Sequence, residues 1–163
     1  MAVDDNPANV DVLLGLLHES GYRVLVADSG CRGIEQLTRE LPDLILLDLM
    51  MPGMNGIETC RRIKAQDAWK HIPILMMTAA DELSSKLAAF EAGAVDFLTK
   101  PIQPAEVLAR LNIHLQIREL QSELESAHRS LNQKNELLAE QIKLRLDAEN
   151  QLEAALTRIS QAP

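Results

Sequence analysis

The chain has few aromatic residues, few cysteines and no surplus of positive charge. Aromatic residues make up 2% of its 163 residues, so an apolar core has to be built from aliphatic side chains and methionine. The net charge of -8 argues against non-specific nucleic-acid binding, which requires an excess of lysine and arginine. The two cysteines, Cys31 and Cys60, lack the spacing of a metal site and indicate free thiols in a reducing compartment.

Long apolar runs and a secretory signal are missing as well. No run is long enough to cross a bilayer, so we expect no membrane partner. Together with the free thiols, this favours a cytoplasmic protein. The length allows one domain with an appendage.

Short apolar runs alternate with helical patterns up to about residue 112. Continuous runs of this length are typical of parallel strands that are buried on both faces of a sheet. The expected strands end at Val3 and cover residues 22–27, 44–47, 74–77 and 95–98. The expected helices cover residues 7–20, 30–40, 57–66 and 83–92, and a fifth begins at Pro104. This alternation predicts an α/β fold with a doubly wound, five-stranded parallel sheet.

The last predicted helix meets no stop signal, because residues 105–160 contain neither glycine nor proline. Apolar residues recur there in a 3-4 alternation, at Ile117, Leu120, Leu124, Ala127, Leu131, Leu138, Ala148, Leu152, Ala155 and Ile159. Such a repeat predicts a left-handed coiled coil, which the polar seam residues Lys134, Gln141 and Arg145 would weaken. The helix would be about 80 Å long. It could instead fold back as a surface helix, but no second apolar segment is left to cover its stripe, which favours self-association.

Polar residues follow four of the predicted strands: Asp4 and Asp5, Asp48, Thr78 and Lys100. The carboxyl ends of strands in an open parallel sheet line its ligand crevice, so we expect these side chains to meet there. Crowded carboxylates need a cation, and Mg²⁺ prefers oxygen ligands. The lysine indicates a phosphate group, toward which a carboxylate is a known nucleophile.

Each of these residues also has a simpler explanation. The acid pair could cap a helix, Asp48 could merely end a strand, Thr78 is a common strand residue and Lys100 could be an exposed loop lysine. Taken singly, these explanations are plausible. Because all five residues lie at or just beyond strand ends, a common site is favoured.

The sequence around these positions resembles the receiver domain of bacterial two-component response regulators. The resemblance covers about residues 1–115 and is most specific from Asp48 to Gly56. It is carried by Val3-Asp4-Asp5-Asn6, Leu47 to Gly56, Met77-Thr78-Ala79 and Phe97-Leu98-Thr99-Lys100-Pro101. It implies a flavodoxin-like sheet of strand order 2-1-3-4-5 for a receiver domain over residues 1–115. Residues 116–163 would form a coiled-coil extension of the fifth helix.

The resemblance also implies roles for the acids. Asp48 would accept a phosphoryl group from a histidine kinase or a phosphotransfer protein. Mg²⁺ would be held by Asp5, Asp48 and the backbone carbonyl of Met50, while Asp4 would act largely through water. Such a chain belongs to a response regulator or a hybrid signalling protein.

The remaining positions are implied to bind the phosphoryl group and to report it. Lys100 and Thr78 would bind phosphoryl oxygens, and the Lys100–Pro101 peptide bond would be cis. Phe97 would be a switch that turns inward as Thr78 moves, remodelling the surface of the fourth helix, fifth strand and fifth helix. The partner would be a second copy, bound through the coil and possibly through that surface, with no direct nucleic-acid contact.

The sequence leaves two alternative functions open. A phosphoaspartate-type hydrolase would also place an aspartate at a strand end, but it usually carries a second acid two residues later, where this chain has Met50. A purely structural dimerisation module with vestigial acids is the other alternative. We expect no enzyme beyond phosphoryl transfer to Asp48 and slow self-dephosphorylation. The short apolar stretch before Asp4 predicts a clipped first strand, which should cost stability.

Overall fold

The computed structural model describes residues 1–79 and 83–160. The chain divides into two units, residues 1–118 and 119–163. In chain order the elements are β1 (Ala2–Val3), α1 (Pro7–Glu19), β2 (Val26–Ala27), α2 (Gly30–Leu37), β3 (Ile45–Asp48), α3 (Gly56–Lys64), β4 (Ile74–Thr78), α4 (Leu83–Glu91), β5 (Asp96–Thr99) and α5 (Pro104–Ser160).

The five strands form one parallel sheet in the order β2-β1-β3-β4-β5. The predicted doubly wound sheet, its strand order and the long C-terminal helix are therefore confirmed. The register aligns the strand ends: Val3 pairs with Leu47, Asp48 with Met77, and Thr78 with Thr99. Residues that follow or end β1, β3, β4 and β5 consequently meet at one edge of the sheet.

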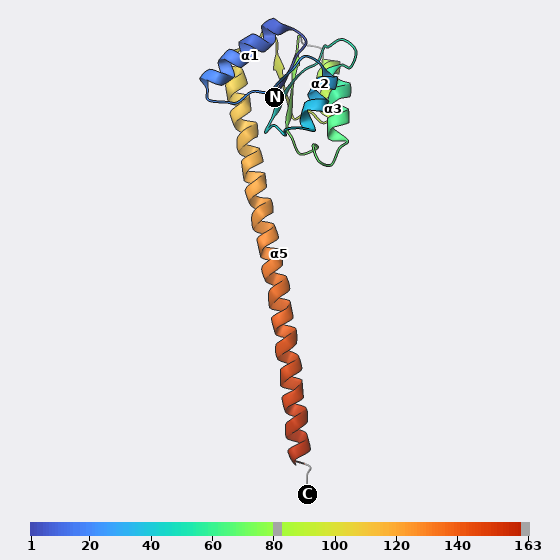
Figure 1. Cartoon of the computed structure of the whole chain (residues 1–163), viewed down its shortest axis with the longest axis vertical. Helices are drawn as coiled ribbons and strands as arrows, with labels where there is room; N and C mark the ends of the chain where they lie inside the picture. Colours follow the sequence, from blue (N-terminus) through green and yellow to red (C-terminus); the bar gives the residue numbers. More distant parts are fainter. Residues whose placement is uncertain (80–82, 161–163) are drawn as a thin grey trace. The chain divides into compact units, whose positions relative to one another are not determined.

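Successive strand residues point to opposite faces of the sheet, and each face has its own helices. On one face, Ala2, Leu46 and Leu75 pack against α1 and the start of α5, among them Leu13, Leu17, Val107 and Leu111. On the other face, Val3, Leu47 and Met76 pack against α2, α3 and α4, through Leu37, Cys60, Ile63 and Ala89. Figure 1 shows α1 and the first turns of α5 on one side of the sheet and α2 and α3 on the other. Burial of each of these Leu or Ile side chains stabilises the fold by about 1.5–3 kcal/mol. The sheet therefore holds the loops at its edge in fixed positions.

Side chains with local hydrogen bonds set the helix starts. The Oδ1 atom of Asn6 accepts a hydrogen bond of 3.0 Å from the backbone N–H of Ala8, and Pro7 occupies the first helical position of α1. The Oδ1 atom of Asn55 likewise accepts from the N–H of Glu58 at 2.8 Å at the start of α3. Both caps fix loops that follow the carboxyl ends of β1 and β3.

Two predicted elements are shorter in the structure by three residues or more. The strand expected over residues 22–27 is confined to Val26–Ala27. Within residues 1–79 and 83–160 it pairs with β1 alone, and β1 supplies two residues. The helix expected over residues 30–40 ends at Leu37, where the N–H groups of Thr38 and Arg39 bond to carbonyls three residues back and tighten the last turn. β1 is also short, with two residues.

The second unit is helical up to Ser160. Its apolar stripe is exposed where side chains are described: Leu120, Leu124, Leu131 and Leu138 have 54–72% of their surface accessible. Among the described residues, no helix is sufficiently apolar over a sufficient length to cross a membrane.

Candidate functional site

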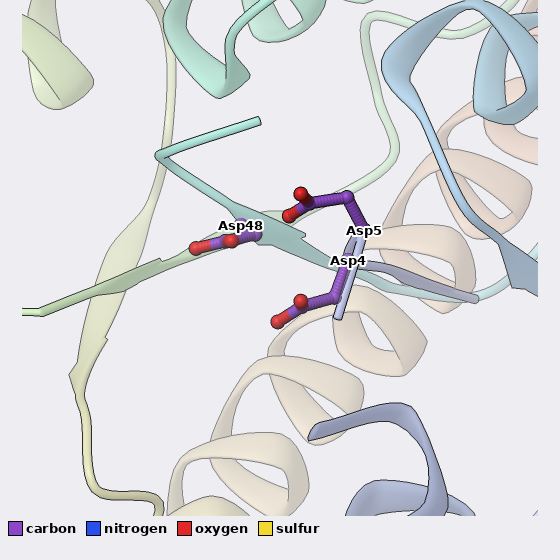
Figure 2. A group of neighbouring side chains, drawn as sticks. All are labelled: Asp4, Asp5 and Asp48. Atoms are coloured by element: carbon purple, nitrogen blue, oxygen red, sulfur yellow. The ribbon is translucent and has the colours of Figure 1, made fainter. Parts of the chain in front are cut away.

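Three carboxylates meet where β1 and β3 end. Asp4 and Asp5 follow β1 directly, and Asp48 is the last residue of β3, the neighbouring strand. One oxygen from each of the three lies within 4.8 Å of the others. Figure 2 shows the three carboxyl groups turned to the same side of the two strand ends. Asp4 and Asp48 are buried, whereas Asp5 is exposed and opens the group to solvent.

Lys100 joins the two buried acids. Its Nζ atom lies 2.8 Å from Oδ2 of Asp4 and 2.8 Å from Oδ1 of Asp48. The backbone holds it there, because the N–H of Lys100 donates a 2.7 Å hydrogen bond to the carbonyl of Thr78 at the end of β4. The Lys100–Pro101 peptide bond is cis, as predicted.

Burial and the contacts of Lys100 determine the pKa shifts of Asp48 and Lys100. Burial raises the pKa of Asp48, and repulsion from Asp4 adds to it, while the hydrogen bond from Lys100 and one from the Met50 backbone oppose the rise. Burial alone would lower the pKa of Lys100, but its hydrogen bonds to Asp4 and Asp48 outweigh burial and raise it. Lys100 therefore stays protonated. Because Asp4 and Asp48 share this one ammonium, the negative charge of Asp48 is only partly compensated, which favours a further cation beside it.

Thr78 and Phe97 lie on the strands next to this group. Thr78 is buried at the end of β4, one residue beyond the partner of Asp48 in the ladder. Phe97 is partly buried against the core below α3 and α4. Its ring lies edge-on to Phe90 at 6.1 Å, and the Lys86 ammonium lies 4.4 Å from its centroid. The structure thus places Thr78 on the strand next to Asp48 and Phe97 on β5, one strand further along the sheet.

The loop after β3 folds back tightly on Asp48. The N–H of Gly56 donates a 3.0 Å hydrogen bond to the Leu49 carbonyl, and the N–H of Leu49 donates one of 2.9 Å to Met77. A Cβ atom on Gly56 would lie 2.2 Å from the carbonyl oxygen of Asp48, so only glycine allows this approach. Met50 is 70% exposed, and its backbone hydrogen bond to Asp48 places its main chain beside that carboxylate.

Sequence reasoning did not include Asn9 among the site residues. Its side-chain Nδ2 atom lies 3.1 Å and 3.0 Å from the two carboxylate oxygens of Asp4. The backbone N–H of Asn6 adds a 2.9 Å bond to Oδ1 of Asp4. The position of Asn9 in the first turn of a helix that starts beside the acids could have indicated this contact.

The donor set fits a hard divalent cation. Carboxylate oxygens are what Mg²⁺ prefers, and it usually retains several waters, which the exposed Asp5 side of the group allows. Three carboxylates facing one ammonium leave the group net negative. The arrangement can therefore hold a divalent cation and a phosphoryl group side by side at Asp48.

Comparison with known proteins agrees with this geometry. The family model of the response regulator receiver domain matches residues 1–112. Response regulator PleD from Caulobacter vibrioides is 42% identical over 111 residues, which cover 68% of this chain and 24% of that protein. The alkaline phosphatase synthesis transcriptional regulatory protein PhoP from Bacillus subtilis is 41% identical over 120 residues, which cover 74% of this chain and 49% of that protein.

A solved structure shows the same likeness. The receiver domain of a sensor histidine kinase from Pseudomonas aeruginosa, with a magnesium ion coordinated in its active-site cleft, is 31% identical with a TM-score of 0.66. The match covers 71% of this chain and 94% of that chain. The chain spans about a quarter of PleD and about half of PhoP, the curated relatives described above.

Proposed function

The chain belongs to the response regulator receiver family, and from this premise we propose that Asp48 is its phosphoacceptor. Receiver domains are generally phosphoacceptors and typically bind Mg²⁺ at an acidic pocket. Lys100 contacts two buried carboxylates, Asp4 and Asp48. The observation that favours Asp48 is that Asp4 already accepts hydrogen bonds from Asn6, Asn9 and Lys100, whereas Asp48 ends β3 next to both other acids. The phosphoryl donor is a histidine kinase or a phosphotransfer protein.

Each residue of the site has a separate role in phosphoryl transfer. An oxygen of Asp48 bonds to phosphorus while the bond between phosphorus and the donor breaks. Lys100 leaves its ion pair with Asp48 and donates to a phosphoryl oxygen, which keeps its charge compensated. Asp5, Asp48 and the Met50 carbonyl would hold Mg²⁺, and Asp4 would act through water. When bound, Mg²⁺ supplies positive charge that offsets repulsion between the carboxylate and the incoming phosphoryl group.

Thr78 and Phe97 transmit the effect of phosphorylation at Asp48 to helices α4 and α5. Thr78 donates its hydroxyl to a phosphoryl oxygen, and Phe97 turns toward the space that Thr78 vacates. Its partners are Phe90 and Lys86 on α4 and Arg110 on α5, whose guanidinium lies 5.6 Å from the ring, so the turn alters contacts of both helices. Exposed Leu87, Phe90 and Val95 support this face as a surface for a second copy.

Incubation with acetyl phosphate and Mg²⁺ tests the assignment. Intact-mass spectrometry should show one added phosphoryl group on the wild type and on Asp11→Asn, a control that removes an exposed acid from α1. Asp48→Asn should add none. Modification of Asp48→Asn to the wild-type extent would exclude Asp48 as acceptor. No turnover of small phosphate esters is expected beyond slow self-dephosphorylation.

We also propose that residues 116–163 form a homodimeric coiled coil that continues the receiver domain at residues 1–115. The support is the exposed leucine stripe, which is the kind of surface that a second helix covers. Sedimentation velocity should give a dimer for the wild type and a monomer for the double variant Leu131→Lys, Leu138→Lys. Leu137→Lys is the matched control, because Leu137 is 57% exposed but lies off the stripe. A dimer that survives the double variant, or fails in the control alone, would contradict the coil.

A further inference from the structure

Asp4 is the most completely satisfied carboxylate of the site. Its side chain has no exposed surface. Oδ1 accepts from the Asn6 backbone and from Asn9, and Oδ2 accepts from Asn9 and from Lys100. A carboxylate has about four acceptor directions, so these contacts leave little room for donors other than a metal-bound water.

The position of the Asn9 amide is the unusual part. Its nitrogen is almost equidistant from the two oxygens, at 3.1 Å and 3.0 Å. It therefore occupies the notch between them, which is where a cation has to sit when a carboxylate binds it through both oxygens. Asn9 is fixed there because it lies in the first turn of α1, a helix that Asn6 caps and Pro7 opens.

This notch matters differently for different cations. Ca²⁺ takes six to eight oxygen ligands at longer distances and readily accepts a carboxylate through both oxygens. Mg²⁺ is smaller, demands octahedral geometry and retains water, so it uses one oxygen per carboxylate. Blocking the Asp4 notch removes ligands that only the larger ion can use.

On the basis of the proposed function, we infer that Asn9 is a specificity-determining residue that favours Mg²⁺ over Ca²⁺ at this site. It does so as a positioning residue: it holds Asp4 toward Lys100 and closes the two-oxygen face of that carboxylate. Asp5 and Asp48 are left as the carboxylates open to the metal. The amide is neutral, so the selectivity comes from geometry rather than from net charge.

Calorimetric titration of the full chain with MgCl₂ and with CaCl₂ tests this inference. The wild type should bind Mg²⁺ more tightly than Ca²⁺. Asn9→Ala should lower the ratio of the Ca²⁺ to the Mg²⁺ dissociation constant by about tenfold, the scale on which outer ligand partners act. Asn9→Ser, whose hydroxyl can reach only one oxygen, should give an intermediate ratio. Val12→Ala, a neutral change at a 53% exposed position of the same helix, should leave the ratio unchanged.

The outcomes separate this inference from the proposed function. A wild type that binds neither ion, and that acetyl phosphate does not modify, would overturn the proposed function. A wild type that binds Mg²⁺ but prefers Ca²⁺, or an Asn9→Ala protein with the wild-type ratio, would overturn only the role of Asn9. Should Asn9→Ala not fold, as judged by circular dichroism, the wild-type preference and the Asn9→Ser ratio decide.

Discussion

Replacing Lys100 by methionine removes the only ammonium that contacts Asp4 and Asp48 among the described residues, and keeps a side chain of similar length. At 2.8 Å and an effective dielectric constant of about 20, each contact contributes about 6 kcal/mol of attraction before desolvation is subtracted. Removing one partner of a buried ion pair costs about 3–5 kcal/mol net, because the remaining charge is left uncompensated. For a folded unit of 118 residues, this loss lowers the thermal midpoint by roughly 10–20 °C.

Thermal unfolding in EDTA, followed by circular dichroism, measures this loss. Lys70→Met is the matched control, because Lys70 pairs with Asp67 on the surface and should cost at most about 0.5 kcal/mol. The double variant Lys100→Met, Asp48→Asn should recover much of the stability, since one of the two stranded charges is gone. Added Mg²⁺ should stabilise the single variant more than the wild type. If Lys100→Met unfolds at the midpoint of Lys70→Met, the two carboxylates do not depend on Lys100 and our electrostatic account of the site is wrong.

Three further predictions concern the acids, the loop and the thiols. Asp48→Asn should raise the thermal midpoint measured without metal. Burial raises the pKa of Asp48, so its ionisation destabilises the folded state as pH rises above the ordinary carboxyl range. The gain in midpoint should vanish in acid, and a gain that is independent of pH would refute this cause. Gly56→Ala should lose about 1–3 kcal/mol in urea unfolding and slow acetyl phosphate labelling, because its Cβ would overlap the Asp48 carbonyl; unchanged unfolding would show that the loop can yield. Burial raises the pKa of Cys60 to about 11, so a thiol reagent at neutral pH should label exposed Cys31 in the native protein and both cysteines in urea; rapid native labelling of Cys60 would contradict its burial.

The sheet could be predicted from the sequence because its strands are buried on both faces. Continuous apolar runs such as Leu44 to Leu47 and Ile74 to Met77 have few alternatives to a central parallel strand. The strand order followed from the family resemblance. The extent of β2 could not be predicted, because Tyr22 to Ala27 has strand composition throughout and its length depends on how many residues β1 supplies.

The acids and Lys100 were found in the sequence because each stands at the end of a predicted strand. Asn9 was not, since an asparagine in the first turn of a helix ordinarily indicates capping or a surface position. Only the three-dimensional arrangement shows that its amide reaches back across the loop to Asp4. The shared lysine contact is likewise a property of side-chain directions, which strand-end positions do not determine.

The long helix α5 was predicted from the absence of glycine and proline over residues 105–160. Self-association of its leucine stripe remains a prediction, because its partner has to come from a second chain. The sedimentation experiment with Leu131 and Leu138 addresses it independently of the phosphorylation chemistry. Repeating the experiment with beryllofluoride would show whether dimerisation responds to the state of Asp48.

A crystal structure of the protein with Mg²⁺ and beryllofluoride, a mimic of the phosphoryl group, tests the central claim most directly. We predict beryllium bonded to a carboxylate oxygen of Asp48, with Lys100 and Thr78 on the fluorine atoms. Mg²⁺ should be bound by Asp5, Asp48 and the Met50 carbonyl. Beryllofluoride on another side chain, or an ion that shares no ligand with Asp48, would contradict the account.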